Sequence, residues 1–151
     1  MADPLVIKIK EAKQLLFDKL KTDLGDQIHV DMLEKGRIED YKTNHQNGAL
    51  VLHYDGSKLS DPAGRNIVHQ NRDMRIAGLL QIRIEKGIGF RDDMIDAAID
   101  SVSGIKIKAI SKVDRVYASN DEYLTPEADE SKQFYEHSIL FIVPTEFQQI
   151  N

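Results

Sequence analysis

The sequence MRIAGLLQIRIE, residues 74–85, is the strongest indication of fold class in this chain. Apolar side chains recur at every second position, interrupted only by Gly78, and polar residues such as Arg75 and Arg83 stand between them. A period of two residues is typical of a β-strand with one buried face. We therefore expect a long strand here, which residues 67–70 can extend. Gly78 predicts either a β-bulge or a close approach of another segment to the backbone.

Two shorter strands are expected before this one. Residues 49–54, ALVLHY, are apolar on both faces, which is typical of a strand at the centre of a sheet. We expect Asp55 and Gly56 to end that strand, and residues 57–66 to form a loop. Residues 28–32 alternate between apolar and polar side chains and predict a second, shorter strand.

Two stretches have the periodicity of amphipathic helices. The first follows Asp3 and Pro4, which together make a favourable helix start, because Asp caps free amides and Pro suits the first helical position. Apolar residues three and four apart then predict a helix over residues 4–24, which Gly25 ends. The same spacing predicts a second helix over residues 90–103.

The remaining sequence predicts two more strands. Residues 105–117 alternate, but their apolar phase shifts near Ser111, so we expect a bulge there. Residues 134–143 predict a last strand, which Pro144 is expected to stop. The whole pattern predicts an α+β fold, with one mostly antiparallel twisted sheet of about five strands and two helices packed on one face. Alternatively, the strand–helix–strand unit of residues 74–117 forms one parallel pair through a right-handed crossover.

Length and composition indicate a single domain over residues 1–151 and argue against several classes of function. The chain has a mass of 17.2 kDa with 41% hydrophobic and 30% charged residues, enough for one hydrophobic core. Without cysteine it has no disulfide, thiolate nucleophile or cysteine-based metal site. A formal net charge of −5 argues against a general nucleic-acid binder. We expect no membrane span and no secretory leader.

The excess of negative charge lies in residues 119–130. This stretch contains five carboxylates and no Lys or Arg, which leaves 20 of the 25 acidic side chains to balance the 20 basic ones elsewhere. We interpret it as one long exposed loop that either is a solvated connection or presents charge to a partner. In the second case Tyr123 and Leu124 would anchor the contact. The candidate interface therefore comprises Asp121, Glu122, Tyr123, Leu124, Glu127, Asp129 and Glu130.

Reactive residues do not converge on a catalytic set in this sequence. Asp92, Asp93 and Asp96 match an Asp-Asp-x-x-Asp pattern that can hold Mg²⁺ against a diphosphate, but acidic residues are also favourable at a helix start. A basic edge carries alternating cations, which commonly protect a strand edge, namely Lys106, Lys108, Lys112 and Arg115. We expect no catalytic residue, no metal and no cofactor.

Several of these segments carry a resemblance to a known family. They are the N-terminal amphipathic helix, the long strand of residues 74–85, the helix with residues 92–100, and the final strand of residues 134–143. The most motif-like segment is residues 48–57, GALVLHYDGS, in which an apolar strand ends in a Tyr-x-Gly-small turn. Over about residues 4–145, this order resembles that of the minor tail proteins of Mu-like contractile-tailed bacteriophages, which are taken as tail terminators.

The resemblance implies a structural role in the virion, with no catalysis. It implies a subunit of a hexameric ring that caps the tail tube, stops its polymerisation and meets the head–neck connector. The implied partners are further copies of the chain, the tail tube protein, and sheath and connector proteins, while DNA passes through without specific binding. The chain would reside in the host cytoplasm during assembly and then in the virion.

Three other interpretations remain open from the sequence. One is a different neck or tail-completion protein, which would also assemble as a ring. A second is a small cytosolic enzyme that uses Asp92, Asp93 and Asp96 with a metal. A third is a regulatory binding module of the host.

Overall fold

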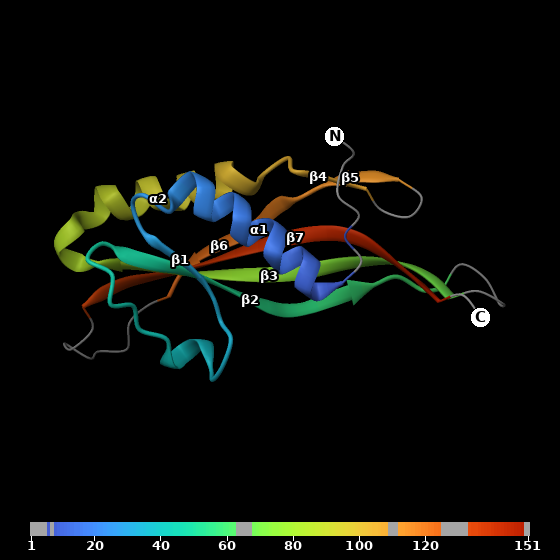
Figure 1. Cartoon of the computed structure of the whole chain (residues 1–151), viewed down its shortest axis with the longest axis horizontal. Coiled ribbons are helices and arrows are strands. Elements are labelled where there is room, and N and C mark those ends of the chain that lie inside the picture. Colours follow the sequence, from blue (N-terminus) through green and yellow to red (C-terminus); the bar gives the residue numbers. More distant parts are fainter. Residues whose placement is uncertain (1–5, 7, 63–67, 109–111, 125–132, 150–151) are drawn as a thin grey trace.

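Two helices and a five-stranded sheet form the framework of the molecule (Figure 1). The computed structural model describes residues 6, 8–62, 68–108, 112–124 and 133–149. In chain order the elements are α1 (Ile9–Leu24), β1 (His29–Met32), the 3₁₀ turn η1 (Ile38–Asp40), β2 (Gly48–Leu59), β3 (Val68–Arg83), the 3₁₀ turn η2 (Ile84–Lys86), α2 (Gly87–Val102), β4 (Lys106–Lys108), β5 (Val113–Arg115), β6 (Tyr117–Tyr123) and β7 (Phe134–Gln149).

The strands of the main sheet lie in the order β1-β2-β3-β7-β6. Only β1 runs parallel to its neighbour β2, and the other described pairs in this sheet are antiparallel. Both helices lie on the same face (Figure 1). These observations confirm the predicted α+β class. The alternative crossover pair is wrong, because β7 pairs with β3 along its whole length and separates it from β6.

The hydrophobic core lies between the helices and the sheet. The helices contribute fully buried residues such as Leu16 and Ala98, and the strands contribute Leu50, Ile76 and Phe141. Burial of such side chains contributes about 1.5–3 kcal/mol each to stability. The alternation read from the sequence therefore assigned the buried face of β3 correctly.

Gly78 is a point of close approach, and the alternative of a bulge there is wrong. The register of β3 with both neighbours runs without interruption through this residue. A Cβ atom on Gly78 would lie 3.0 Å from Leu50 Cδ1 and 3.4 Å from Phe141 Cε2. The missing side chain therefore makes room for larger ones from β2 and β7.

Two strands continue past the residues expected to end them. β2 continues to Leu59. Its register with β3 shifts between Tyr54 and Ser57, and Gly56, which has a φ of 95°, lies within this irregularity. β7 continues through Pro144, which is opposite Asp73 of β3. Because β6 pairs with β7 only as far as Ile142, no described strand pairs with that side of β7 at Pro144, where a missing amide is tolerated.

Both helix starts differ from the prediction. α1 begins at Ile9, after an extended Lys8, so a start at residue 4 is wrong; Asp3 and Pro4 lie outside the described residues. α2 begins at Gly87, three residues before the predicted start. Gly87 has a φ of 88°, which lets the chain leave the η2 turn and enter the helix directly.

The segment of residues 105–117 is not one bulged strand. β4 and β5 pair antiparallel as a separate two-stranded sheet, and residues 109–111 between them lie outside the described residues. Ile107 is fully buried and anchors this hairpin to the core. The phase shift near Ser111 therefore marks a change of chain direction, which periodicity alone cannot distinguish from a bulge.

Candidate interaction surface

The face of the sheet that points away from the helices is covered only in part. The register places Val51, Leu79 and Ser138 side by side on this face. Residues 33–47, which include η1, lie on this side of the sheet, opposite α1 and α2 (Figure 1). The surface next to this segment is therefore open to another molecule.

Gln81 holds this covering segment against the sheet. Its side chain is buried; Nε2 donates a hydrogen bond to the Tyr41 carbonyl at 2.7 Å, and Oε1 accepts one from the Thr43 amide at 3.2 Å. The Tyr41 hydroxyl donates to Asp31 at 3.0 Å, and burial together with this bond raises the pKa of Tyr41 to about 12. These bonds hold the middle of this irregular segment in one position against the sheet.

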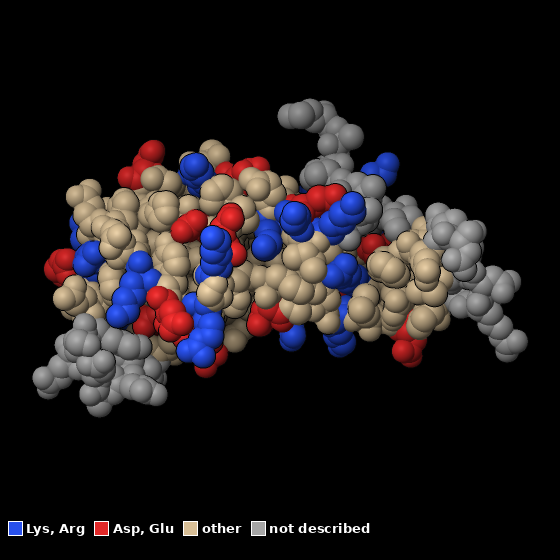
Figure 2. All heavy atoms as spheres, turned by 60° about the horizontal axis from the view of Figure 1, so that its bottom comes forward, with Lys and Arg blue, Asp and Glu red and all other residues tan. Residues whose placement is uncertain are grey.

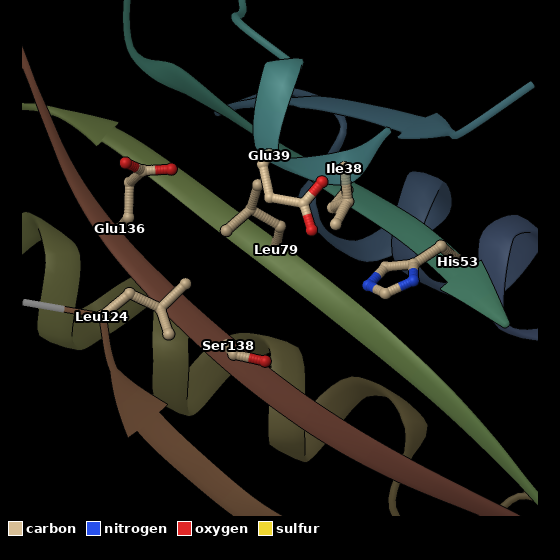
Figure 3. Close-up of a pocket in the computed structure, with 7 residues that line it drawn as sticks. All are labelled: Ile38, Glu39, His53, Leu79, Leu124, Glu136 and Ser138. Atoms are coloured by element: carbon tan, nitrogen blue, oxygen red, sulfur yellow. The ribbon is translucent and has the colours of Figure 1, made fainter. Parts of the chain in front are cut away.

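A pocket opens between this segment and the end of β6. Its volume is about 250 Å³. Figure 3 shows Leu79 in the middle, the carboxylates of Glu39 and Glu136 along one side, and Leu124 and Ser138 along the other. Its full lining is Ile38, Glu39, His53, Leu79, Leu124, Glu136 and Ser138. We call these seven residues the acidic pocket.

The two glutamates set the charge of the acidic pocket. Glu39 is 69% exposed and lies 3.8 Å from Arg37, which is itself 75% exposed. Glu136 Oε2 lies 3.4 Å from Gln81 Nε2. Burial lowers the pKa of the His53 imidazole, while Asp55 and Glu39 oppose this shift. His53 is therefore neutral at pH 7 and adds no positive charge to the pocket.

The predicted acidic interface is partly described by the structure. Asp121, Glu122 and Tyr123 belong to β6, so a loop at these positions is wrong; Glu127, Asp129 and Glu130 lie outside the described residues. The strand forms because β7 offers a long partner, and charged side chains are tolerated on an edge strand. Among the four described residues of the predicted set, Leu124 lines the acidic pocket.

Two other members of the predicted interface, Asp121 and Tyr123, make contacts within the subunit. Asp121 Oδ1 lies 2.8 Å from His137 Nε2, on the face of the sheet that carries the helices. Arg91 of α2 stacks on the Tyr123 ring at 5.6 Å, although Tyr123 remains 41% exposed. The structure thus distributes the predicted set over both faces of β6.

The aspartates of α2 lie on the exposed side of that helix. Asp92, Asp93 and Asp96 are all exposed, and Asp92 accepts two hydrogen bonds from Arg91. Because α2 begins at Gly87, these residues follow its first turn, and the proposed stabilisation of the helix start does not apply. Within the described residues, no group of three or more His, Asp or Glu side chains is arranged to hold a metal ion.

The β4–β5 hairpin presents one basic face to solvent. Its register places Lys106 opposite Arg115 and Lys108 opposite Val113, so these four side chains share a face. All four are exposed, and Val113 has an exposed fraction of 55%. We call these four residues the basic face. They include three of the four cations predicted as a basic edge, while Lys112 forms an ion pair with Asp114 at 3.2 Å.

Charges of both signs are interspersed on the side of the molecule opposite the helices (Figure 2). Uncharged surface lies between them, and neither sign forms one continuous field. Such a surface favours docking to a partner of matched local charge over general attraction to a polyanion. In the described part of the chain, neither helix has the length and apolar character needed to cross a membrane.

Sequence reasoning missed most of the acidic pocket. Glu39, Glu136 and His53 come from three distant segments, and no local pattern connects them. One signal was present: Gln81 is a polar residue inside an apolar strand, and it marks the place where residues 41–43 pack against the sheet.

Comparison with known proteins assigns the class of this chain. A family model described as Gp37 protein matches residues 16–146, so the chain belongs to the Gp37 family. This is a family of phage-related structural proteins, and the protein is accordingly a structural component of a phage-type virion.

Two other comparisons complete this result. No curated protein matches the chain. Among solved structures, a chain of "Virion of native gene transfer agent (GTA) particle" matches with a TM-score of 0.44 and 12% sequence identity, over 87% of this chain and 92% of that chain. The family match, and not this distant likeness, carries the assignment.

Proposed function

We propose that this protein is a tail terminator: a subunit of a ring, of six copies in our proposal, that caps the tail tube and joins it to the neck. The family supports a place in the virion, and the resemblance of the sequence to Mu-like tail terminators supports a place at the end of the tail. Its partners in this proposal are further copies, the tail tube protein, and sheath and connector proteins. Assembly takes place in the host cytoplasm.

The observation that carries this proposal is a sheet with two unlike free edges. On one side β1 covers β2 only from Ala49 to Leu52, and residues 53–59 of β2 have no further strand beside them in the described chain. On the other side β6 is the last described strand. Two different edges favour head-to-tail contacts between copies, and such contacts close into rings when the rotation permits.

The proposed role is mechanical, and the protein performs no chemical step. Specificity would reside in matched surfaces between subunits and with the tube. Double-stranded DNA would pass through the ring without specific contacts, in keeping with a net charge of −5.

Deleting the gene tests this function through tail length. We expect particles that lack the protein to have tails of uncontrolled length that fail to join heads, because polymerisation of the tube is no longer stopped. Electron microscopy of lysates provides the length distribution, and the wild-type gene supplied in trans is the control. Tails of normal length that fail only to join heads would contradict a terminator and indicate a neck or tail-completion protein.

A further inference from the structure

Two surfaces of this chain carry complementary charge and lie on opposite faces of the sheet. The acidic pocket lies on the face of the sheet opposite the helices, whereas the basic face belongs to the β4–β5 hairpin on the helix side (Figure 1). We propose that the basic face of one copy docks into the acidic pocket of the next copy. This inference rests on the proposed ring and names the contact that would build it.

The chemistry of the acidic pocket fits a long cationic side chain. Its floor and walls are apolar, formed by Leu79, Ile38 and Leu124, while Glu39 and Glu136 lie along one side. The side chains of Lys and Arg have a matching apolar part and charged part. Their apolar stem packs on hydrocarbon while the charged tip reaches a carboxylate. An anionic ligand would meet the two carboxylates inside the pocket, while the cation next to them, the exposed Arg37, lies 3.8 Å from Glu39 and does not line the pocket.

The size of the pocket also favours an amino-acid side chain over a small-molecule ligand as its occupant. Its volume of about 250 Å³ is below the roughly 300–1,000 Å³ of most sites for small-molecule ligands. The space is sufficient for one or two side chains of a protruding element. His53, which is neutral at pH 7, allows a cation to enter without repulsion from the imidazole.

The basic face supplies the matching group. Lys108 lies opposite the exposed Val113 and Lys106 opposite Arg115, so this face combines one apolar side chain with three cations. Within the described residues neither Lys106 nor Lys108 is in an ion pair, and both are available to a partner. Buried Ile107 fixes the opposite face of the hairpin to the core, which gives the projecting cations a defined position.

The placement of the two surfaces makes the contact heterologous. Each copy would use its acidic pocket towards one neighbour and its basic face towards the other, as a ring requires. A nucleic acid bound to the basic face is the competing possibility, since phosphates also attract clustered Lys and Arg. The two possibilities predict different roles for Glu39, which lies on the opposite side of the sheet from the basic face.

Charge reversal tests the contact in the full chain. We expect Glu39→Lys and Lys108→Glu each to weaken self-association by about tenfold or more, because like charges would then face each other. Combining both changes in one chain restores opposite charges at the contact, and association should return to within about threefold of wild type. Sedimentation velocity at several protein concentrations provides the association constants. Glu39 and Lys108 are exposed, so both variants should fold, which thermal melting checks.

Matched controls reverse charges away from the two surfaces. Asp93→Lys on the exposed side of α2 and Lys10→Glu on α1 should leave association unchanged. If wild-type rings form and neither Glu39→Lys nor Lys108→Glu affects them, this contact is wrong while the ring stands. If Lys108→Glu instead abolishes only the retention of duplex DNA, the basic face meets phosphate and the contact is again wrong. A wild-type chain that stays monomeric would overturn the ring as well.

Discussion

Gly78 shows how one missing side chain sets the packing of the central strands. The space above it is filled by Leu50 and Phe141 from the two neighbouring strands. We predict that Gly78→Val lowers the free energy of unfolding by about 1–3 kcal/mol, because the added carbons overfill the core. Urea denaturation measures this change. Gly89→Ala is the control: a Cβ there meets nothing within 4 Å, and its stability should be unchanged or higher. Equal stability of Gly78→Val and wild type would show that the core has spare room.

His53 makes stability depend on pH. Burial lowers its pKa in the folded state below the ordinary value of 6.5, so the unfolded chain binds a proton more readily. Stability should therefore be constant above about pH 6.5 as far as this group is concerned, and should fall as the pH drops below that value towards the lower folded pKa. We expect His53→Gln to remove part of this acid slope. Unfolding midpoints in urea between about pH 5 and 8 provide the comparison, and an unchanged slope would contradict a lowered pKa of the half-buried imidazole.

The middle of the segment of residues 33–47 is tied to β3 by the Gln81 side chain, and its end by Arg83, which donates to the His45 carbonyl. Gln81 bonds to the backbone of both Tyr41 and Thr43. Replacing it in Gln81→Leu removes the partner of the buried Thr43 amide, at a cost of about 1–3 kcal/mol, and that of the partly buried Tyr41 carbonyl, at a smaller cost. We predict a matching loss of stability and faster amide hydrogen exchange confined to this segment. Gln14→Leu, on the exposed side of α1, should do neither. Equal exchange rates in the two variants would show that other contacts hold the segment.

Periodicity predicted the elements of the core, and the errors lie where tertiary contacts decide. The bodies of β3 and α1 followed the sequence because their apolar faces are buried there. The predicted end of the long strand at residue 85 is wrong, because Ile84 and Glu85 belong to the η2 turn and Ile84 is exposed. Periodicity could not show that β7 would continue through Pro144, since this depends on which strands pair with β7 at that point. Nor could it distinguish the β4–β5 hairpin from a bulged strand.

The candidate surface was less accessible to sequence reasoning than the fold. Charge counting identified Asp121 and Glu122 but assigned them to a loop, because charge alone does not reveal that β6 pairs with β7. The acidic pocket combines Glu39 and Glu136, which are almost a hundred residues apart and become neighbours only through the sheet. Among the members of the predicted set that the structure describes, Leu124 is the one that lines this pocket.

For the assembled particle, the acidic stretch remains a proposed docking site for the neck. We predict that neutralising Glu122, Glu127, Asp129 and Glu130 with Gln and Asn leaves melting and self-association unchanged but impairs the joining of tails to heads. Asp121 is kept, because it pairs with His137 inside the subunit. Plaque counts and electron microscopy of tails supply the readout. Full infectivity of the neutralised variant would show that this stretch is only a solvated connection.

The mass of the purified protein in solution tests the proposed ring most directly. Native mass spectrometry and light scattering at micromolar concentration should find a closed species of six subunits, about 103 kDa from a 17.2 kDa chain. Self-association should weaken as salt rises, since charged surfaces join the copies. A species that stays at 17.2 kDa at every concentration and salt tested would contradict a ring-forming subunit.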